Sequence, residues 1–147
     1  MPTVTLYRAT DRIDSYGSGA CFAADEDVAE EYLDNPGFGG STLLSIEVPV
    51  DPDRVLSLVD GRRNGVPYGH QARSAWSNLA EALGLDADDE DVVHALREEG
   101  AHYIHGIIDS PRRRDELHEA GYDWVVYEDS FPESAVTWAY LGEDIDL

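Results

Sequence analysis

Two adjacent carboxylates, Glu128 and Asp129, directly follow the apolar run Trp124–Tyr127. The run is rich in residues that favour strands, and Gly121 and Pro132 bracket it with strand breakers. Side chains alternate along a strand, so the two carboxylates point to opposite faces and only one can enter a given cleft. A carboxylate in a cleft stabilises positive charge that develops in a transition state. The alternative is a strand that simply emerges into solvent in an acidic chain, and the pair alone does not decide.

Other residues with catalytic potential carry weaker patterns. His94, His102, His105 and His118 suggest a metal, but a three-residue spacing without a third spaced ligand does not define a site, and we expect none. The single Cys21 has no disulfide partner and is interpreted as core or pocket wall. The sequence has no nucleophile elbow and no glycine-rich phosphate motif. The basic cluster Arg112–Arg114 is interpreted as the exposed first turn of a helix, in preference to a phosphate site.

Charge dominates the composition. The 147 residues, read as one domain over 1–147, include 31 acidic and 10 basic side chains, all ten of them arginine, for a formal charge of -21. The negative electrostatic potential of such a charge argues against direct nucleic-acid binding, and it favours either simple solvation or a basic partner. A GC-rich genome, a salt-adapted host and electrostatic mimicry of nucleic acid all remain open as its origin. Without an 18-residue apolar run or a signal-peptide pattern, we expect a soluble, cytoplasmic protein that makes no membrane contact.

The elements that would position these residues follow from periodicity and capping. Strands are predicted at 3–8, 20–23, 43–48, 55–58, 124–129 and 134–141. Helices are predicted from Asp25 through Leu33, over 71–83, over 89–99 with Asp88 as cap, and from Ser110-Pro111 to Ala120. Residues 101–108 fit either a strand or a loop. Strands early and late around central helices indicate an α+β fold with a mainly antiparallel or mixed sheet.

The order of three segments carries a family resemblance. They are Leu6–Thr10, which contains Arg8, then Gly19–Ala24 leading into a helix over Asp25–Tyr32, and finally Val125–Asp129. This order resembles the ADP-ribosyltransferase fold, in which a first-strand Arg or His binds NAD, a second strand leads into a helix, and a late-strand Glu or Asp is catalytic.

Within that fold the chain most resembles the small phage-encoded anti-CRISPR ADP-ribosyltransferases that modify the type I-F surveillance complex. The parallel segments are Arg8-Ala9-Thr10, Ala20-Cys21-Phe22, the helices with Ala75-Trp76 and Val92-Val93, and Gly121-Tyr122 before Glu128-Asp129. Arg8 stands where that family has His, and Phe22-Ala23-Ala24 lacks the Ser-Thr-Ser of the Arg-type toxins.

The resemblance implies mixed or antiparallel sheets around an NAD cleft with a central helical insert. It implies a mono-ADP-ribosyltransferase that uses NAD as substrate to modify a protein side chain, with a CRISPR-Cas subunit in the host cytoplasm as the implied target. Asp129 would be the catalytic carboxylate, with Glu128 as the fallback. Arg8 and Thr10 would hold NAD, and Phe22 or Tyr32 would offer a ring face to nicotinamide.

Alternatives stay open for the same residues. Arg8 would otherwise be a strand-end salt-bridge partner, and both rings would be core. NAD is anionic and this chain would repel it, so Arg8 and Arg12 would have to make the cleft locally basic. A non-catalytic inhibitor that mimics nucleic acid and binds a basic protein is the alternative from another class, and an NAD-hydrolysing toxin that transfers to water is the third.

Overall fold

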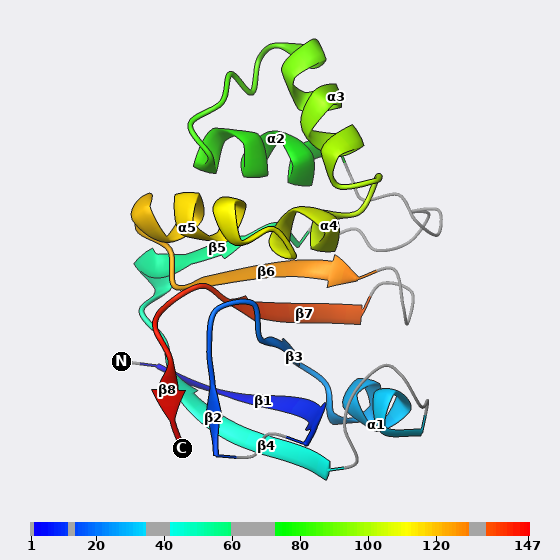
Figure 1. The fold of residues 1–147 in the computed structure, drawn as a ribbon, viewed down its shortest axis with the longest axis vertical. Helices are drawn as coiled ribbons and strands as arrows, with labels where there is room; N and C mark the ends of the chain where they lie inside the picture. The colour runs from blue at the N-terminus through cyan, green and yellow to red at the C-terminus, as the bar shows by residue number, and fades with distance from the viewer. Residues whose placement is uncertain (1, 12–13, 35–41, 60–72, 130–134) are drawn as a thin grey trace.

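The computed structural model describes residues 2–11, 14–34, 42–59, 73–129 and 135–147, without the side chains of 32–34, 73–74, 129 and 135 (Figure 1). Its strands are β1 (Thr3–Thr10), β2 (Ser15–Tyr16), β3 (Cys21–Ala23), β4 (Thr42–Pro49), β5 (Val55–Ser57), β6 (Trp124–Asp129), β7 (Ala135–Tyr140) and β8 (Ile145–Asp146). Its helices are α1 (Glu26–Asp34), the 3-10 turn η1 (Pro52–Arg54), α2 (Arg73–Ala82), α3 (Glu90–Glu99), α4 (Ile104–Ile108) and α5 (Pro111–Glu119).

Strands from both ends of the chain share one mixed sheet. Among the described residues it has six strands in the order β4-β1-β3-β7-β6-β5, and β2 and β8 form a separate ribbon. Neighbours are antiparallel except β5 and β6, which run parallel. A parallel pair needs a long crossover, and the segment containing α2 to α5 supplies it. The expected α+β class with a mixed sheet is confirmed.

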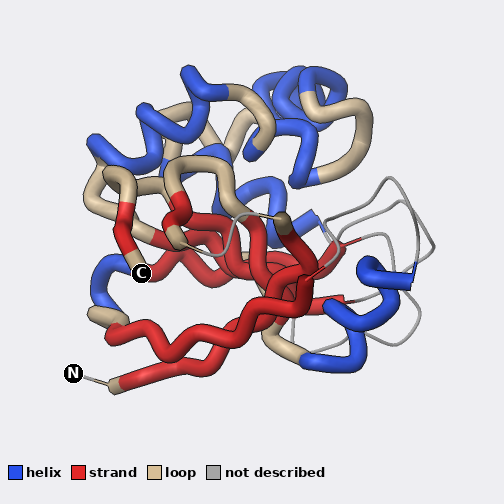
Figure 2. The backbone as a smooth tube through the Cα atoms, turned by 60° about the horizontal axis from the view of Figure 1, so that its bottom comes forward, coloured by secondary structure: helices blue, strands red, loops and turns tan. Residues whose placement is uncertain are grey.

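Helices α4 and α5 lie over the β5–β6 end of the sheet, with α2 and α3 beyond them, and α1 lies apart against β1, β3 and β4 (Figures 1 and 2). Between helices and sheet is a helix-side cluster. Its buried members are Leu56, Leu58, Ala75, Trp76, Leu79, Ala80, Val93, Leu96, Ile104, Ile107, Ile108, Leu117, Val125, Tyr127, Ala139 and Leu141. Burial of these apolar side chains attaches the helical layer to β6.

The other face of the sheet holds an aromatic cluster. Its buried members are Leu6, Tyr16, Ala20, Phe22, Ile46, Val48, Val50, Trp124 and Tyr140. The Tyr16 ring centroid lies 5.2 Å from that of Phe22 and 5.0 Å from that of Tyr140, with interplanar angles of 79° and 81°. Such edge-to-face contacts stabilise beyond simple burial. Tyr16 comes from β2, so this contact docks the β2–β8 ribbon on the cluster (Figure 1).

Local capping explains where two helices begin. The backbone N–H of Asp27 donates to Asp25 Oδ1 at 3.1 Å, which confirms Asp25 as the residue before α1. The cap of α3 is Asp89, whose Oδ1 accepts from Asp91 N at 2.9 Å, so the expected cap Asp88 was wrong by one position. Both residues are aspartates in an Asp-rich turn, and side-chain type alone does not separate them.

The ambiguous segment 101–108 contains a helix, α4. Ala101 and His102 have φ values of 54° and 72°, which reverse the chain after α3. The isoleucines 104, 107 and 108 then follow helical spacing and are fully buried. A Cβ on Gly106 would collide with the backbone oxygen of Gly100, so glycine permits this close approach. The helix is only five residues long, too short for its periodicity to be recognised in the sequence.

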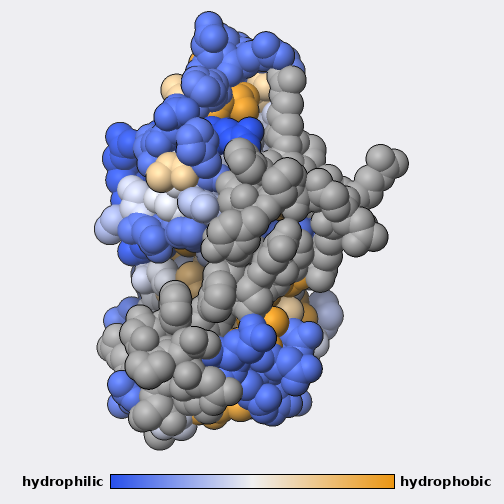
Figure 3. All heavy atoms as spheres, turned by 90° about the vertical axis from the view of Figure 1, so that its right-hand side faces the viewer, coloured by the Kyte–Doolittle hydropathy of each residue, from blue (hydrophilic) through white to orange (hydrophobic). Residues whose placement is uncertain are grey.

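On the face seen in Figure 3, the described residues are mainly hydrophilic, and small hydrophobic areas lie among the hydrophilic ones. No helix in the described ranges combines the length and apolar content needed to cross a membrane.

Candidate functional site

Arg8 lies on the face of β1 that carries the aromatic cluster. It follows Leu6 at a two-residue interval, and Leu6 belongs to that cluster. The register Tyr7↔Ala23 places Arg8 beside Phe22 of β3. The Arg8 guanidinium carbon lies 5.6 Å from the Phe22 ring centroid, a cation–π contact. The sheet therefore holds this cationic group at the border of an otherwise apolar surface.

Phe22 supports Arg8 and offers no surface to a ligand. Its exposed fraction is 1%, and its ring contacts Tyr16, Trp124 and the Arg8 guanidinium. This burial agrees with the alternative in which the Phe22 ring is core, and stacking of Phe22 on nicotinamide stays a prediction. Thr10, two positions beyond Arg8, is 6% exposed. Tyr32 lies in α1, and its side chain is outside the described part, as is the whole of Arg12.

Of the two carboxylates, the structure places Glu128 on the face of Arg8. Trp124 belongs to the aromatic cluster, and Glu128 follows it at an even spacing on β6. The intervening Val125 and Tyr127 belong to the helix-side cluster. Glu128 is half-buried, with its Oε1 atom shielded from solvent. The backbone of Asp129 pairs with Ala135, and its side chain lies outside the described part.

The strand registers estimate how far apart these groups lie. Phe22 pairs with Trp138 and Trp138 with Val126, so Glu128 lies two strands across and two residues along from Phe22. Arg8 lies one strand further, beside Phe22, so spacings of about 4.8 Å between strands and about 3.3 Å per residue put the Cα atoms of Arg8 and Glu128 on the order of 16 Å apart. Arg8 and Glu128 therefore face one surface, with Phe22 and Trp138 between them.

Beside Arg8 the surface is hollowed into a pocket of about 450 Å³. Its lining residues are Arg8, Tyr16, Gly17, Ser18, Gly19, Ala20, Arg114 and Asp144. The turn over residues 17–20 is anchored to β7, because Gly19 N donates to Tyr140 O at 2.8 Å and Tyr140 N donates to Ala20 O at 2.9 Å. The pocket volume is in the range of small-molecule sites. It brings together residues from β1, the β2–β3 turn, α5 and the segment before β8.

Ionisation in this region is shifted by burial and by ion pairs. Burial raises the pKa of Tyr16 and, chiefly for the same reason, raises the pKa of Tyr140 to about 12. At the start of β6, a hydrogen bond from Arg54 holds the pKa of Asp123 below its usual range. That pair is bidentate, with Nε–Oδ2 at 2.7 Å and Nη2–Oδ1 at 2.9 Å. It fixes β6 to the segment that precedes β5.

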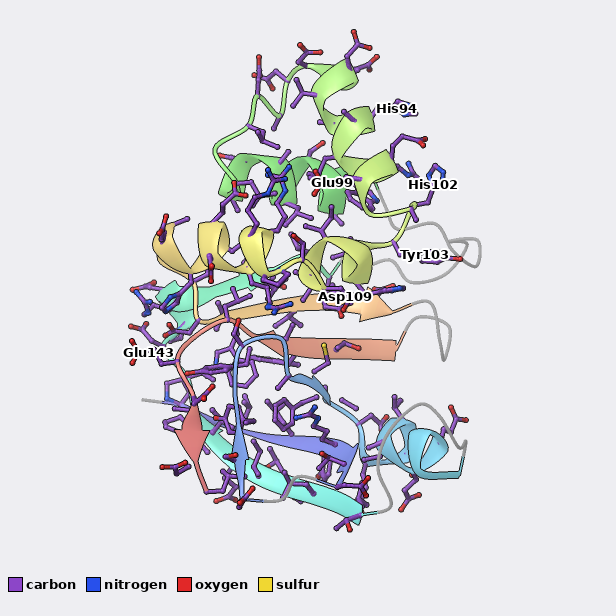
Figure 4. All side chains as sticks on the ribbon, viewed as in Figure 1. His94, Glu99, His102, Tyr103, Asp109 and Glu143 are labelled. Carbon is purple, nitrogen blue, oxygen red and sulfur yellow. The ribbon has the colours of Figure 1, made fainter. Side chains whose placement is uncertain are left out.

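His94, His102 and Cys21 lie away from this pocket. His94 and His102 each place Nε2 3.6 Å from Glu98 Oε1, on the outer side of α3 (Figure 4). Within the described residues, no group of three His, Cys, Asp or Glu side chains is arranged to hold a metal. Cys21 is half-buried and packs against the helix-side cluster, with Sγ 3.9 Å from the Tyr127 hydroxyl, which agrees with its interpretation as core or pocket wall.

Sequence reasoning missed Ser18, Arg114 and Asp144 as pocket residues. The available signal was the Gly17-Ser18-Gly19 turn, whose glycines allow other groups to approach the backbone closely. The three comparisons, with family models, with curated proteins and with solved structures, returned no match for this chain.

Proposed function

We propose that the protein is an NAD-dependent mono-ADP-ribosyltransferase that modifies a protein side chain. The observation that supports this most directly is the placement of the Arg8 guanidinium, held on Phe22 at 5.6 Å, on the same sheet face as the Glu128 carboxylate. A cation for the diphosphate and an anion for the ribose are the two groups that this reaction requires on one surface. The fold class agrees with the proposal only at the level of α+β with a mixed sheet.

The proposed chemistry uses few protein groups. The bond between ribose C1 and the nicotinamide nitrogen breaks, and the nicotinamide leaves with the electron pair. A nucleophile on the acceptor side chain then bonds to C1 and loses its proton. Positive charge develops on the ribose in an oxocarbenium-like transition state, as in glycoside hydrolysis. Glu128 would stabilise that charge, and Arg8 would bind the diphosphate through its fork of N–H donors. Asp129 remains the second carboxylate to test.

The net charge bears on both substrates. A formal charge of -21 repels an anionic dinucleotide, but Arg8 and Arg114 line one pocket and make the surface there locally basic. The same acidic field attracts an acceptor protein with a basic surface. We therefore propose a basic protein as the acceptor, in keeping with a nucleic-acid-binding subunit of a host defence complex.

The test measures nicotinamide release and transfer of labelled ADP-ribose to proteins of a matched host lysate. The wild type should do both. Glu128→Gln should lower turnover on the order of 100-fold while the fold persists, because it removes the charge that stabilises the transition state. Glu47→Gln is the matched control, since Glu47 is an exposed carboxylate on β4 that pairs with Thr5, and it should retain wild-type turnover.

Other outcomes select among the alternatives. A loss confined to Asp129→Asn would move the catalytic role from Glu128 to Asp129. NAD consumption without an acceptor would identify a hydrolase that transfers to water. The transferase proposal fails if the protein binds NAD but neither consumes it nor labels any protein. Salt-weakened binding to a basic partner in that case, unchanged in Glu128→Gln, would support the non-catalytic acidic inhibitor.

A further inference from the structure

Three consecutive arginines at the start of α5 have different surroundings. Arg112 is 70% exposed and lies 3.7 Å from Glu99 and 3.8 Å from Glu116. Arg113 is 12% exposed and donates to both oxygens of Glu99 at 2.8 Å. Arg112 agrees with the expected exposed helix turn, whereas Arg113 is largely buried by its ion pairs. Arg114 instead turns away from Glu99 and Glu116 and lines the pocket. Only the first two are therefore held by carboxylates within the helical layer.

Arg114 is held in place by neutral acceptors. Its Nε donates to Ser18 Oγ at 3.0 Å and its Nη1 donates to the carbonyl oxygen of Ile108 at 2.7 Å. Among the described residues it makes no ion pair, although the chain has 31 acidic residues. The guanidinium is thus oriented by two hydrogen bonds while its charge is left for another anion. Holding an arginine in this way reduces the entropy that a ligand would otherwise have to remove.

Gly19 allows this arrangement. Its φ is +91°, in the region that favours glycine, and a Cβ built there would lie 2.9 Å from the Arg114 guanidinium carbon. The turn therefore lies directly against the guanidinium plane. Arg8 lines the same pocket from β1, and Asp144 lines it from the segment before β8. The lining combines two cations, one carboxylate and the hydroxyl of Ser18.

We infer that this pocket binds the phosphate group of a small organic molecule, with Arg114 and Arg8 as the two cationic ligands. Two planar forks of N–H donors suit phosphate oxygens, and Asp144 and Ser18 suit hydroxyl groups on the same ligand. The inference stands on the pocket alone. If the proposed function also holds, the phosphate belongs to NAD, and Arg114 becomes a second anchor that the sequence did not predict.

The experiment titrates inorganic pyrophosphate and ADP-ribose into the intact protein by calorimetry. Wild-type protein should bind both, and binding should weaken with added salt. Arg114→Gln should weaken both by about tenfold or more, because charge-assisted hydrogen bonds to the phosphate are lost. The matched control is Arg112→Gln, which removes the same charge two positions earlier on α5, and its affinity for both probes should stay within about twofold of the wild type. Arg114→Lys keeps the positive charge but loses the fork of N–H donors, so its affinity for both probes should lie between those of Arg114→Gln and Arg112→Gln.

Specific results would overturn the inference. One is the absence of binding of either probe to the wild type, and another is an equal loss in Arg112→Gln and Arg114→Gln. If Arg114→Gln does not fold, Ser18→Ala and Arg114→Lys serve in its place, and wild-type affinity in both would reject the site. Phosphate binding without NAD consumption would retain the pocket and reject the transferase. NAD consumption by Arg114→Gln with an unchanged KM for NAD would retain the transferase and reject the pocket.

Discussion

Raising the pH should destabilise the fold through one tyrosine of the aromatic cluster. The hydroxyl of Tyr140 has a pKa raised to about 12 in the folded protein, chiefly by burial, against about 10 in the unfolded chain. Between these values the unfolded state loses its proton first. Stability is therefore complete below pH 10 and falls as the pH rises from about 10 to about 12. The loss from Tyr140 is about 1.4 kcal/mol at pH 11 and at most about 2.7 kcal/mol above pH 12.

The composition makes this titration unusually clear. The ten basic residues are all arginines, so no lysine ionises in the same range, and the titrating side chains are the eight tyrosines and Cys21. Burial of Tyr16 raises its pKa also, which adds to the loss in the same direction. Tryptophan fluorescence follows the unfolding, because Trp124 lies in the aromatic cluster and Trp138 packs against it.

The assay is urea unfolding at pH 8, 9, 10 and 11 for the wild type and for Tyr140→Phe. The free energy of unfolding should fall with pH less steeply in the variant, by about 1.4 kcal/mol between pH 8 and pH 11. Equal slopes in wild type and Tyr140→Phe would refute the argument that burial of this hydroxyl disfavours its ionisation.

Two further predictions concern the supports of the site. Asp123→Asn removes the carboxylate that pairs with Arg54 and whose pKa that pair lowers, so the variant should be slightly less stable than the wild type at pH 7. As the pH falls below about 4 the wild-type carboxylate is protonated as well, and the two stabilities should converge. Urea unfolding at both pH values measures the difference. Gly106→Ala forces a Cβ against the Gly100 carbonyl and should cost about 1–3 kcal/mol; an unchanged melting temperature would show that α4 and the α3–α4 turn separate freely.

Local patterns predicted the main strands and the starts of α1 and α5, because alternation and capping act over a few residues. They could not decide between Glu128 and Asp129. Every residue from Trp124 to Tyr127 is apolar, and both faces of β6 are buried, one by the aromatic cluster and one by the helices. A run without polar residues does not show which of its side chains point to which face of the sheet. Only the register with β7 and β3 assigns Glu128 to the face of Arg8.

The same limit applies to Arg114. Three consecutive arginines look equivalent in the sequence, but a helix turns by about 100° per residue and sends them in different directions. The acceptors that separate them, Glu99 on α3 and Ser18 before β3, come from elsewhere in the chain. Non-local contacts of this kind are beyond propensity and spacing.

Strand β3 connects the two halves of the sheet, since it pairs with β1 on one side and with β7 on the other. This has a consequence for the timing of assembly during synthesis. The ribosome must add more than a hundred residues after Phe22 before its partner Trp138 exists, and Asp144 follows later still. Nascent chains released early would contain Arg8 but would lack β7 and Asp144, and so would not form the sheet face or the pocket that Arg8 lines. Any activity of the site should therefore appear abruptly with the last strands, and an N-terminal fragment should show none of it.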